Sequence, residues 1–265
     1  MGALQEKFDA ARAEHRAVLI GYLPAGFPDY HGCIDAIAIM VESGVDVVEV
    51  GLPYSDPLMD GATIQQAVDI ALSGGTATPT VLSTVAAIAA TGAPTLVMSY
   101  WNPIEKYGVE AFARDLAGSG GVGVITPDLT PEESGPWMRA TDSAGIDRVY
   151  LVAPSSSDER IAVVAGATTG FVYAASTMGV TGTRTTVGSA AGDLVARTRA
   201  LTDRPIAVGL GVSTGDQAAE VAAYADGVIV GSAFVRALLD APSRGAGLDA
   251  VAALTVSLAA GVRRR

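Results

Sequence analysis

Short apolar runs rich in β-branched residues alternate with longer, Ala-rich amphipathic stretches along most of the chain. This alternation is typical of parallel strands covered by crossover helices. It also predicts a helix before the first strand and two helices between the second and third strands, a longer connection than one βα unit requires. The pattern predicts eight strands, at 17–23, 46–50, 94–100, 121–126, 147–153, 171–176, 205–209 and 226–230.

Eight such units in 265 residues favour an α/β fold of the (β/α)8 TIM-barrel type, for which about 250 residues are typical. A doubly wound sheet, whose strand order reverses at a crevice, fits the strand count less well. Because no linker or charge run separates two compositions, we expect a single domain over residues 1–265. We expect it to carry an extra N-terminal helix and extended second and sixth βα loops.

The charge balance and the chain ends limit the possible partners. A net charge of −11 leaves too few Lys and Arg residues for nucleic-acid binding. The charged N-terminal stretch lacks the apolar segment of a secretory signal, and we expect the apolar stretch at 248–262 to be too short to span a bilayer. Cys33 is the only cysteine, so an internal disulfide is excluded. We therefore expect a cytoplasmic protein.

The first candidate for chemistry is a carboxyl group at the end of the second strand, because TIM barrels place their active sites at the C-terminal ends of strands. Val45, Val47 and Glu49 share one strand parity, so Glu49 faces the barrel axis if the valines do. Desolvation there would raise its pKa toward the range in which it both gives and takes a proton. The competing interpretation is that Glu49 meets solvent or an Arg at the strand end.

Two more acids, Asp56 and Asp60, follow in the stretch "GLPYSDPLMDGATIQ". Taken singly, each is typical of a turn, since Asp-Pro and Asp-Gly dipeptides cap backbone amides. Together with Glu49 they place several acids over one barrel mouth, which turn chemistry explains less well.

Three glycine-rich segments follow the last three strands: "GVTGTR" at 179–184, "GLGVSTG" at 209–215 and "GSAFVRAL" at 231–238. Glycines let backbone amides approach an anion closely, and the helix that starts near Gly231 and Ser232 adds N–H donors and its dipole. Loop tightness explains any one of these segments. Three of them at the corner where TIM barrels bind phosphate predict a phosphate site without lysine.

The motifs, histidines and lysines that the sequence contains argue against other kinds of site. GLGVSTG misses the dinucleotide-binding spacing by one residue, and no Walker loop is present. His15 and His31 are the only histidines, which argues against a histidine metal site or a Ser-His-Asp triad but leaves a carboxylate-bound Mg²⁺ open. Lys7 and Lys106 both lie outside the predicted strands, which argues against a Schiff-base aldolase. Metal-free acid-base chemistry on a small phosphorylated substrate remains.

At this point the chain resembles the tryptophan synthase α subunit family. The acidic stretch matches the family's second βα loop. Five more segments match in order over nearly the whole chain: "GYLPAGFPD", "YWNPIEKYG", "ITPDLTPEE", "GVTGTR" and "GLGVSTGDQ". The resemblance implies reversible retro-aldol cleavage of indole-3-glycerol phosphate to indole and glyceraldehyde 3-phosphate.

The resemblance also implies a role for each candidate residue. Glu49 would be the catalytic acid-base residue, and Asp60 would accept the indole N–H hydrogen bond and stabilise the positive charge on the protonated ring. Tyr173 and Thr181 would position the glycerol chain and close the sixth loop. The phosphate would be held by Gly182, Gly211, Gly231 and Ser232. The indole pocket would be walled by Tyr22, Met98, Tyr100, Ile125 and Val152, for which plain barrel core is the alternative.

A partner is implied as well. Asp56 and Pro57 match positions that contact a β subunit, a pyridoxal-phosphate enzyme that receives indole, so we expect an α₂β₂ assembly. The pyridoxal phosphate belongs to that subunit, and this chain is expected to need no cofactor.

Four positions depart from the usual family pattern. Tyr54 and Leu210 stand where Phe is common, Met59 where a small residue is common, and Ala62 where Pro stiffens the loop. Loss of the proline predicts a freer acidic loop, with Asp60 poorly ordered until the partner binds.

Three alternatives remain open beside the lyase. The chain could be a non-catalytic activator of a β subunit, which the presence of both Glu49 and Asp60 disfavours. It could release indole without any partner. It could also use the same barrel for sugar-phosphate isomerisation by an acid-base pair.

Overall fold

The computed structural model describes residues 2–175, 189–209 and 211–264. Its strands pair in parallel in one sheet, in the order β5-β4-β3-β2-β1-β9-β8-β7-β6. The strands are β1 (Val18–Pro24), β2 (Val47–Gly51), β3 (Thr95–Met98), β4 (Gly123–Ile125), β5 (Asp147–Val149), β6 (Leu151–Val152), β7 (Val172–Ala175), β8 (Ile206–Gly209) and β9 (Gly227–Val230).

The sheet closes on itself at Tyr150. This residue separates β5 from β6, the two ends of the strand order, so both ends belong to one continuous chain segment. The backbone N–H of Tyr173 donates to the carbonyl of Tyr150 at 3.1 Å, which joins β7 to the junction. The TIM barrel and all eight expected strands are confirmed, except that the segment predicted at 147–153 forms two short strands instead of one.

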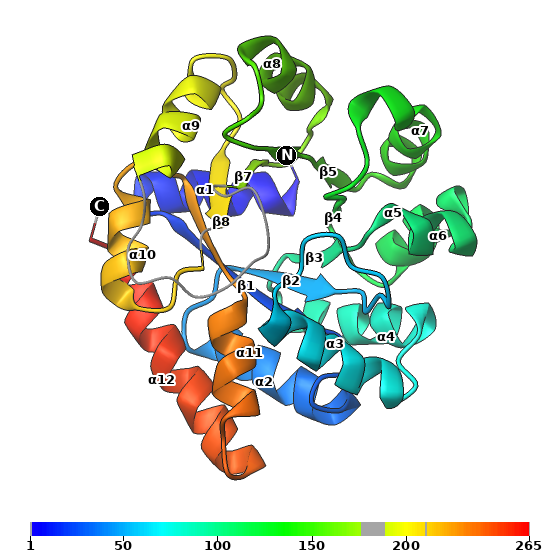
Figure 1. Cartoon of the computed structure of the whole chain (residues 1–265), viewed down its shortest axis with the longest axis vertical. Helices are drawn as coiled ribbons and strands as arrows, with labels where there is room; N and C mark the ends of the chain where they lie inside the picture. Colours follow the sequence, from blue (N-terminus) through cyan, green and yellow to red (C-terminus); the bar gives the residue numbers. More distant parts are fainter. Residues whose placement is uncertain (1, 176–188, 210, 265) are drawn as a thin grey trace.

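The helices surround this barrel (Figure 1). A helix precedes β1 and two helices lie between β2 and β3, as predicted. The described helices are α1 (Ala3–Ala13), α2 (Tyr30–Glu42), α3 (Ala62–Ser73), α4 (Thr78–Ala89), α5 (Trp101–Tyr107), α6 (Val109–Gly118), α7 (Gly135–Ala144), α8 (Asp158–Ala167), α9 (Ser189–Arg199), α10 (Gly215–Ala222), α11 (Ser232–Leu239) and α12 (Arg244–Val262), with a 3₁₀ turn at Pro131–Glu133.

Alternate residues of the strands form two apolar layers. The outer layer lies between sheet and helices, and the inner layer fills the barrel. Leu4 and Phe8 of α1 join the inner layer, and the Phe8 ring lies 5.7 Å from that of Phe171, so α1 closes the end at which the strands begin. The opposite end, where the strands finish, is left for the site.

Strand β2 shows what this alternation does to a charged residue. Val47 belongs to the inner layer, as expected, and Glu49 shares its parity and is only 4% exposed. The expectation for Val45 is wrong: it precedes β2 and packs in the outer layer against Gly21. The inward direction of Glu49 therefore rests on Val47 alone.

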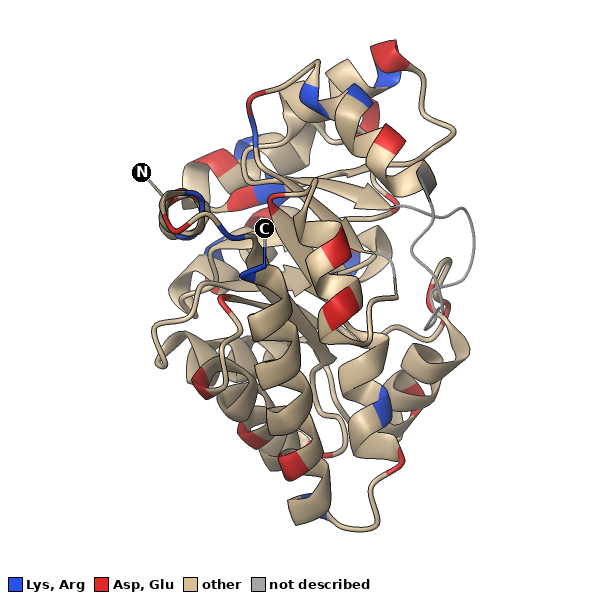
Figure 2. Ribbon diagram, turned by 90° about the vertical axis from the view of Figure 1, so that its left-hand side faces the viewer, with Lys and Arg blue, Asp and Glu red and all other residues tan. Residues whose placement is uncertain are grey.

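The C-terminal helix corrects another expectation. α12 begins at Arg244, so at 19 residues and a mean hydropathy of 1.6 it is long and apolar enough to cross a membrane by length and composition. It packs instead against α2, α10 and α11, with Val251, Leu258 and Val262 fully buried. Acidic residues with interspersed Lys and Arg are spread over the helices and loops (Figure 2).

Candidate active site

Glu49 is the third of the five residues of β2, paired in register with Tyr22 of β1 and Leu96 of β3. Its Oε2 atom is buried and has no hydrogen-bond partner within the described part of the chain. Burial, and after it the nearby charge of Asp60, raise the pKa of Glu49 to about 8. The side chain is thus a neutral acid at neutral pH, set at the mouth of the barrel.

Asp60 lies on the loop that joins β2 to α3. Burial raises its pKa, and a hydrogen bond from the Tyr100 hydroxyl opposes that rise. The pKa of Tyr100 is itself raised by burial first and by Asp60 second, so the proton stays on the phenol and Asp60 accepts. Asp60 is therefore held as the acceptor of the pair, while Glu49 is held as a potential donor.

Two further tyrosines, Tyr22 of β1 and Tyr173 of β7, lie near both acids. Burial raises the pKa of Tyr22 well above its ordinary value, with contributions from Asp60 and Glu49, and the pKa of Tyr173 is raised by burial, Glu49 and Asp60. The four groups are close enough to interact electrostatically. The structure therefore brings together the acids and tyrosines that the sequence predicted.

Two glycines at strand ends make room for these rings, and the sequence reasoning gave neither of them this role. A Cβ at Gly51 would lie 2.4 Å from the Tyr22 hydroxyl oxygen, and one at Gly209 would lie 2.2 Å from that of Tyr173. Any side chain there would displace a tyrosine. The signal that could have found them is a glycine at the last position of a strand on this edge.

The glycine corner lies across Tyr22 from the acids. A Cβ at Gly231 would lie 3.0 Å from Cδ1 of Tyr22, so the tyrosine stands between Gly51 on one side and Gly231 on the other. Gly211 has φ of +66°, the left-handed region that favours glycine. These positions place backbone of β8, β9 and α11 at one corner of the mouth.

The amino end of α11 supplies N–H groups at this corner. No side chain caps it at Gly231, and the backbone hydrogen bonds of the helix begin with the N–H of Phe234 donating to the Gly231 carbonyl at 2.9 Å. Ser232, the first helical residue, is buried. Such an end suits an anion. The other predicted phosphate and loop residues, Thr181 and Gly182, lie outside the described residues.

Among the predicted pocket walls, the structure separates inner from outer positions. Ile125 belongs to the inner layer, and Met98, paired with it in register, is half-buried beside that layer. Val152 does not fit: it packs in the outer layer with Tyr150, whereas Val149 and Leu151 pack inward. The alternation of the strand therefore gives Leu151 the position predicted for Val152.

The rim of the acidic loop protrudes from the barrel. Asp56 is exposed and accepts a hydrogen bond from the Ser55 hydroxyl at 2.6 Å, and Leu58 is 75% exposed. Pro57 lies between them and is partly buried. The predicted contact of Asp56 and Pro57 with a partner stays a prediction on this exposed rim.

The acidic loop is held at its base by other contacts. The Met59 N–H donates to the Tyr100 hydroxyl at 3.2 Å, and the Gln65 side-chain amide donates to the Asp60 carbonyl at 2.7 Å. Tyr54 accepts a hydrogen bond from Asn102, which no sequence argument had singled out. The poor order of Asp60 in the isolated chain stays a prediction, and these contacts are what would oppose it.

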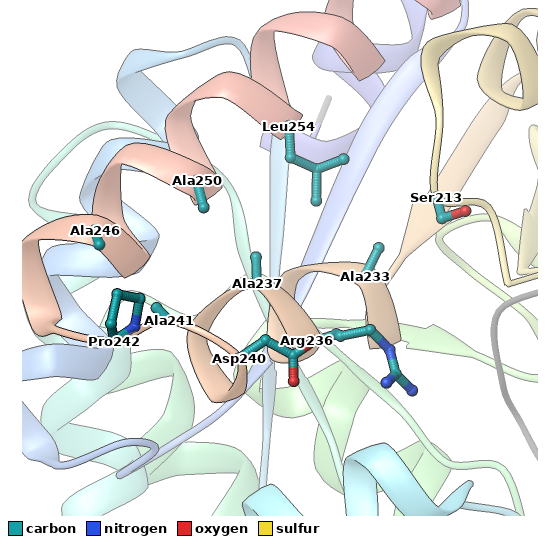
Figure 3. A pocket seen from close by; sticks show the side chains of 10 residues that line it. All are labelled: Ser213, Ala233, Arg236, Ala237, Asp240, Ala241, Pro242, Ala246, Ala250 and Leu254. Atoms are coloured by element: carbon teal, nitrogen blue, oxygen red, sulfur yellow. The ribbon is translucent and has the colours of Figure 1, made fainter.

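A separate cavity of about 540 Å³ lies between α11 and α12 (Figure 3). Half of its lining residues are alanines, and its polar residues are Ser213, Arg236 and Asp240. It contains neither predicted acid, and Arg236 is already bonded to Thr63 at 2.7 Å. Within the described residues, no group of three or more His, Cys, Asp or Glu side chains is placed to hold a metal ion. The acidic mouth is the better candidate site.

Comparison with known proteins shows which family the chain resembles in sequence. The family model described as tryptophan synthase alpha chain matches residues 8–261. The tryptophan synthase alpha chain of Thermobifida fusca (strain YX) is 59% identical, covering 99% of this chain and 98% of its own length. That of Nocardia farcinica (strain IFM 10152) is 60% identical over 98% of this chain and 96% of its own length.

Solved structures agree with the sequence relatives. A chain of Mycobacterium tuberculosis tryptophan synthase superposes with a TM-score of 0.93 at 54% identity, covering 98% of both chains. The tryptophan synthase subunit alpha of Legionella pneumophila superposes with a TM-score of 0.90 at 30% identity, over 99% of this chain and 98% of that one. Since a family model spans nearly all of the chain and full-length relatives share more than half of its residues, the chain belongs to the tryptophan synthase alpha chain family.

Proposed function

We propose that Glu49 and Asp60 divide the cleavage of indole-3-glycerol phosphate between them, as proton carrier and as anchor of the indole ring. As a member of this family the chain is a lyase of tryptophan biosynthesis. The observation that carries the assignment is the contrast between two neighbouring carboxyl groups. Burial keeps Glu49 protonated at neutral pH, whereas Asp60 accepts a hydrogen bond from Tyr100.

The reaction requires one proton to enter and one to leave. Protonated Glu49 gives its proton to the ring carbon that carries the glycerol chain, and the resulting carboxylate takes the proton from the adjacent glycerol hydroxyl. The carbon–carbon bond then breaks, its electron pair returns to the ring, and indole and glyceraldehyde 3-phosphate form. Glu49 ends protonated, as it began. Asp60 accepts the indole N–H and stabilises the positive charge that the ring carries between the two steps.

The phosphate lies at the other end of the substrate. Backbone N–H groups at Gly211, Gly231 and Ser232 are its proposed partners, joined by Gly182, because α11 presents an uncapped amino end there. Tyr22 stands between the two ends and would flank the ring with Met98, Tyr100 and Ile125. Tyr173, beside Gly209, would contact the glycerol chain together with Thr181.

The partner proposed for this chain is a tryptophan synthase β subunit, in an α₂β₂ assembly in the cytoplasm. The exposed rim around Asp56, Pro57 and Leu58 is its proposed contact. That subunit would carry pyridoxal phosphate and consume the indole, and this chain would use no cofactor of its own.

Product analysis tests the proposal. The isolated full chain is incubated with indole-3-glycerol phosphate, with and without added β subunit, and indole and glyceraldehyde 3-phosphate are measured together. We expect the two products in equal amounts, slowly from the chain alone and faster with the partner. Absence of indole under both conditions would support a non-catalytic activator instead. Equal rates under both conditions would support a lyase that works without a partner.

A further inference from the structure

The acidic loop is tied to the next barrel unit by a hydrogen bond between two side chains 48 residues apart. The Asn102 side-chain amide donates to the Tyr54 hydroxyl at 3.0 Å, in a partly buried position. Tyr54 lies on the loop that carries Asp60, and Asn102 is the second residue of α5. The bond thus connects the loop after β2 to the helix after β3.

Tyr100 lies between this bond and Asp60. The Tyr54 ring packs on the Tyr100 ring with centroids 5.5 Å apart. The Tyr100 hydroxyl accepts the Met59 N–H at 3.2 Å and donates to Asp60. Because the phenol has one proton and that proton goes to Asp60, a shift of the Tyr100 ring would directly change the aim of Asp60.

The Asn102 end of the connection is itself fixed to the barrel. The N–H of Trp101, the first residue of α5, donates to both carboxylate oxygens of Asp128, at 2.9 and 3.1 Å. The Trp101 ring packs edge-on against the buried Trp137, 5.8 Å away. Asn102 is therefore a rigid anchor, and the acidic loop is the part that it holds.

We propose that Tyr54 and Asn102 are positioning residues, which hold Tyr100 against the acidic loop and so keep Asp60 aimed at the indole N–H before any partner binds. The inference rests on the proposed function of Asp60. It assigns to the chain itself part of the ordering that a bound β subunit would otherwise supply. The Tyr54 hydroxyl is the informative group, since its removal leaves the contact between the Tyr54 and Tyr100 rings in place.

The main test compares Tyr54→Phe with a matched control, Tyr107→Phe, in the isolated full chain. The Tyr107 hydroxyl also makes one partly buried side-chain hydrogen bond, to Asp115 at 2.9 Å, and it lies on the same helix as Asn102. We expect Tyr54→Phe to lower kcat/KM for indole release roughly threefold to tenfold, the size of one neutral hydrogen bond. We expect Tyr107→Phe to leave it unchanged.

Three readouts separate positioning from a general loss of structure. Affinity for inorganic phosphate should stay the same in Tyr54→Phe. Added β subunit should restore most of the lost activity. The acid limb of the pH profile should move to higher pH, because Asp60 loses part of the Tyr100 hydrogen bond that lowers its pKa. The other titratable groups that face Asp60 are Glu49, Tyr22 and Tyr173, and the substitution leaves all three in place.

Asn102→Ala completes the design. It should reproduce the effect of Tyr54→Phe, and the double variant should lose no more activity than either single variant, because both remove the same bond. If the wild-type chain releases indole but Tyr54→Phe matches it, or if Tyr107→Phe loses as much, the inference is wrong while the proposed function stands. If the wild-type chain releases no indole even with the β subunit, the proposed function fails, and the inference fails with it.

Discussion

Two regions of the candidate site lie on either side of Tyr22: the acidic edge, with Glu49 and Asp60, and the glycine corner, with Gly211 and Gly231. The proposed function uses side chains at the first and backbone N–H groups at the second. At the acidic edge the side chains carry the proposed chemistry: burial raises the pKa of both acids, and the hydrogen bond from Tyr100 opposes that rise at Asp60. At the glycine corner the proposed contacts come from the backbone, because φ of +66° at Gly211 favours glycine and a Cβ at Gly231 would lie 3.0 Å from Tyr22. The comparison teaches that the acidic edge can be tested by changing charge and pH, whereas the glycine corner can be tested by changing backbone conformation.

The largest expected difference between the two edges comes from Glu49→Gln. The amide keeps the shape of the side chain but cannot give and take a proton, so we expect indole release to fall by a factor of about 100 to 10,000. The affinity for inorganic phosphate should stay within about twofold of the wild type, since the glycine corner is untouched. Steady-state kinetics and isothermal titration measure the two effects; a variant that keeps most of its activity would contradict the proton transfer.

The stability of the protein should also respond to Glu49. In the unfolded chain this carboxyl group loses its proton near pH 4.5, whereas burial keeps it protonated in the folded chain up to about pH 8. The folded state therefore holds one more proton across this window, and the free energy of unfolding should fall as pH rises through it. Glu49→Gln removes this dependence.

Denaturant unfolding of both proteins at about pH 5 and about pH 8 measures this effect. The free energy of unfolding of Glu49→Gln, relative to that of the wild type, should rise by about 3 to 4 kcal/mol between the two pH values. A difference that is the same at both pH values would mean that Glu49 titrates alike in the folded and unfolded chains. The distinction between a buried acid and an ordinary surface carboxylate would then be lost.

The pH dependence of activity should sharpen the comparison further. Glu49 must be protonated to start the reaction, so kcat/KM should fall about tenfold per pH unit above about pH 8. On the acid side activity should fall as Asp60 takes up a proton, at a higher pH than for an ordinary aspartate because burial raises its pKa. Phosphate affinity, measured over the same range, should not follow the Glu49 limb. If the phosphate affinity fell together with the deprotonation of Glu49, the phosphate would bind beside Glu49 and not at the glycine corner.

The smallest expected effect concerns the glycine corner. Gly211→Ala puts a side chain on a left-handed backbone, which costs about 1 kcal/mol and should weaken phosphate binding about fivefold, with kcat little changed. Gly145→Ala is the matched control: its φ is +69°, nothing would contact its Cβ, and it ends α7. The two variants should lose similar stability, but only Gly211→Ala should lose affinity. Equal affinities would remove Gly211 from the site.

The barrel was predictable because each strand is a short apolar run flanked by turn residues, and the runs match the observed strands. The break at Tyr150 was not, since apolar residues continue on both sides of it. Strand parity places Glu49 correctly through Val47, and the same alternation places Leu151 inward and Val152 toward the helices.

The candidate site was predictable to the extent that side-chain type carries it. Glu49, Asp60 and the glycines have recognisable chemistry, and they lie on strands or on the loops that follow them. The bond between Tyr54 and Asn102 could not be predicted, because the two residues are 48 positions apart and only barrel closure brings them together. The same holds for Gly51, whose role depends on where the Tyr22 ring lies.

The most direct test of the division between the two edges is a crystal structure of the chain with a non-cleavable indole phosphate bound. The account predicts the indole nitrogen within hydrogen-bond distance, about 3 Å, of the Asp60 carboxylate. It places the substituted ring carbon beside Glu49 and the phosphate against the backbone at Gly211, Gly231 and Ser232. A ligand bound with its phosphate near Asp60, or bound in the cavity between α11 and α12, would contradict it.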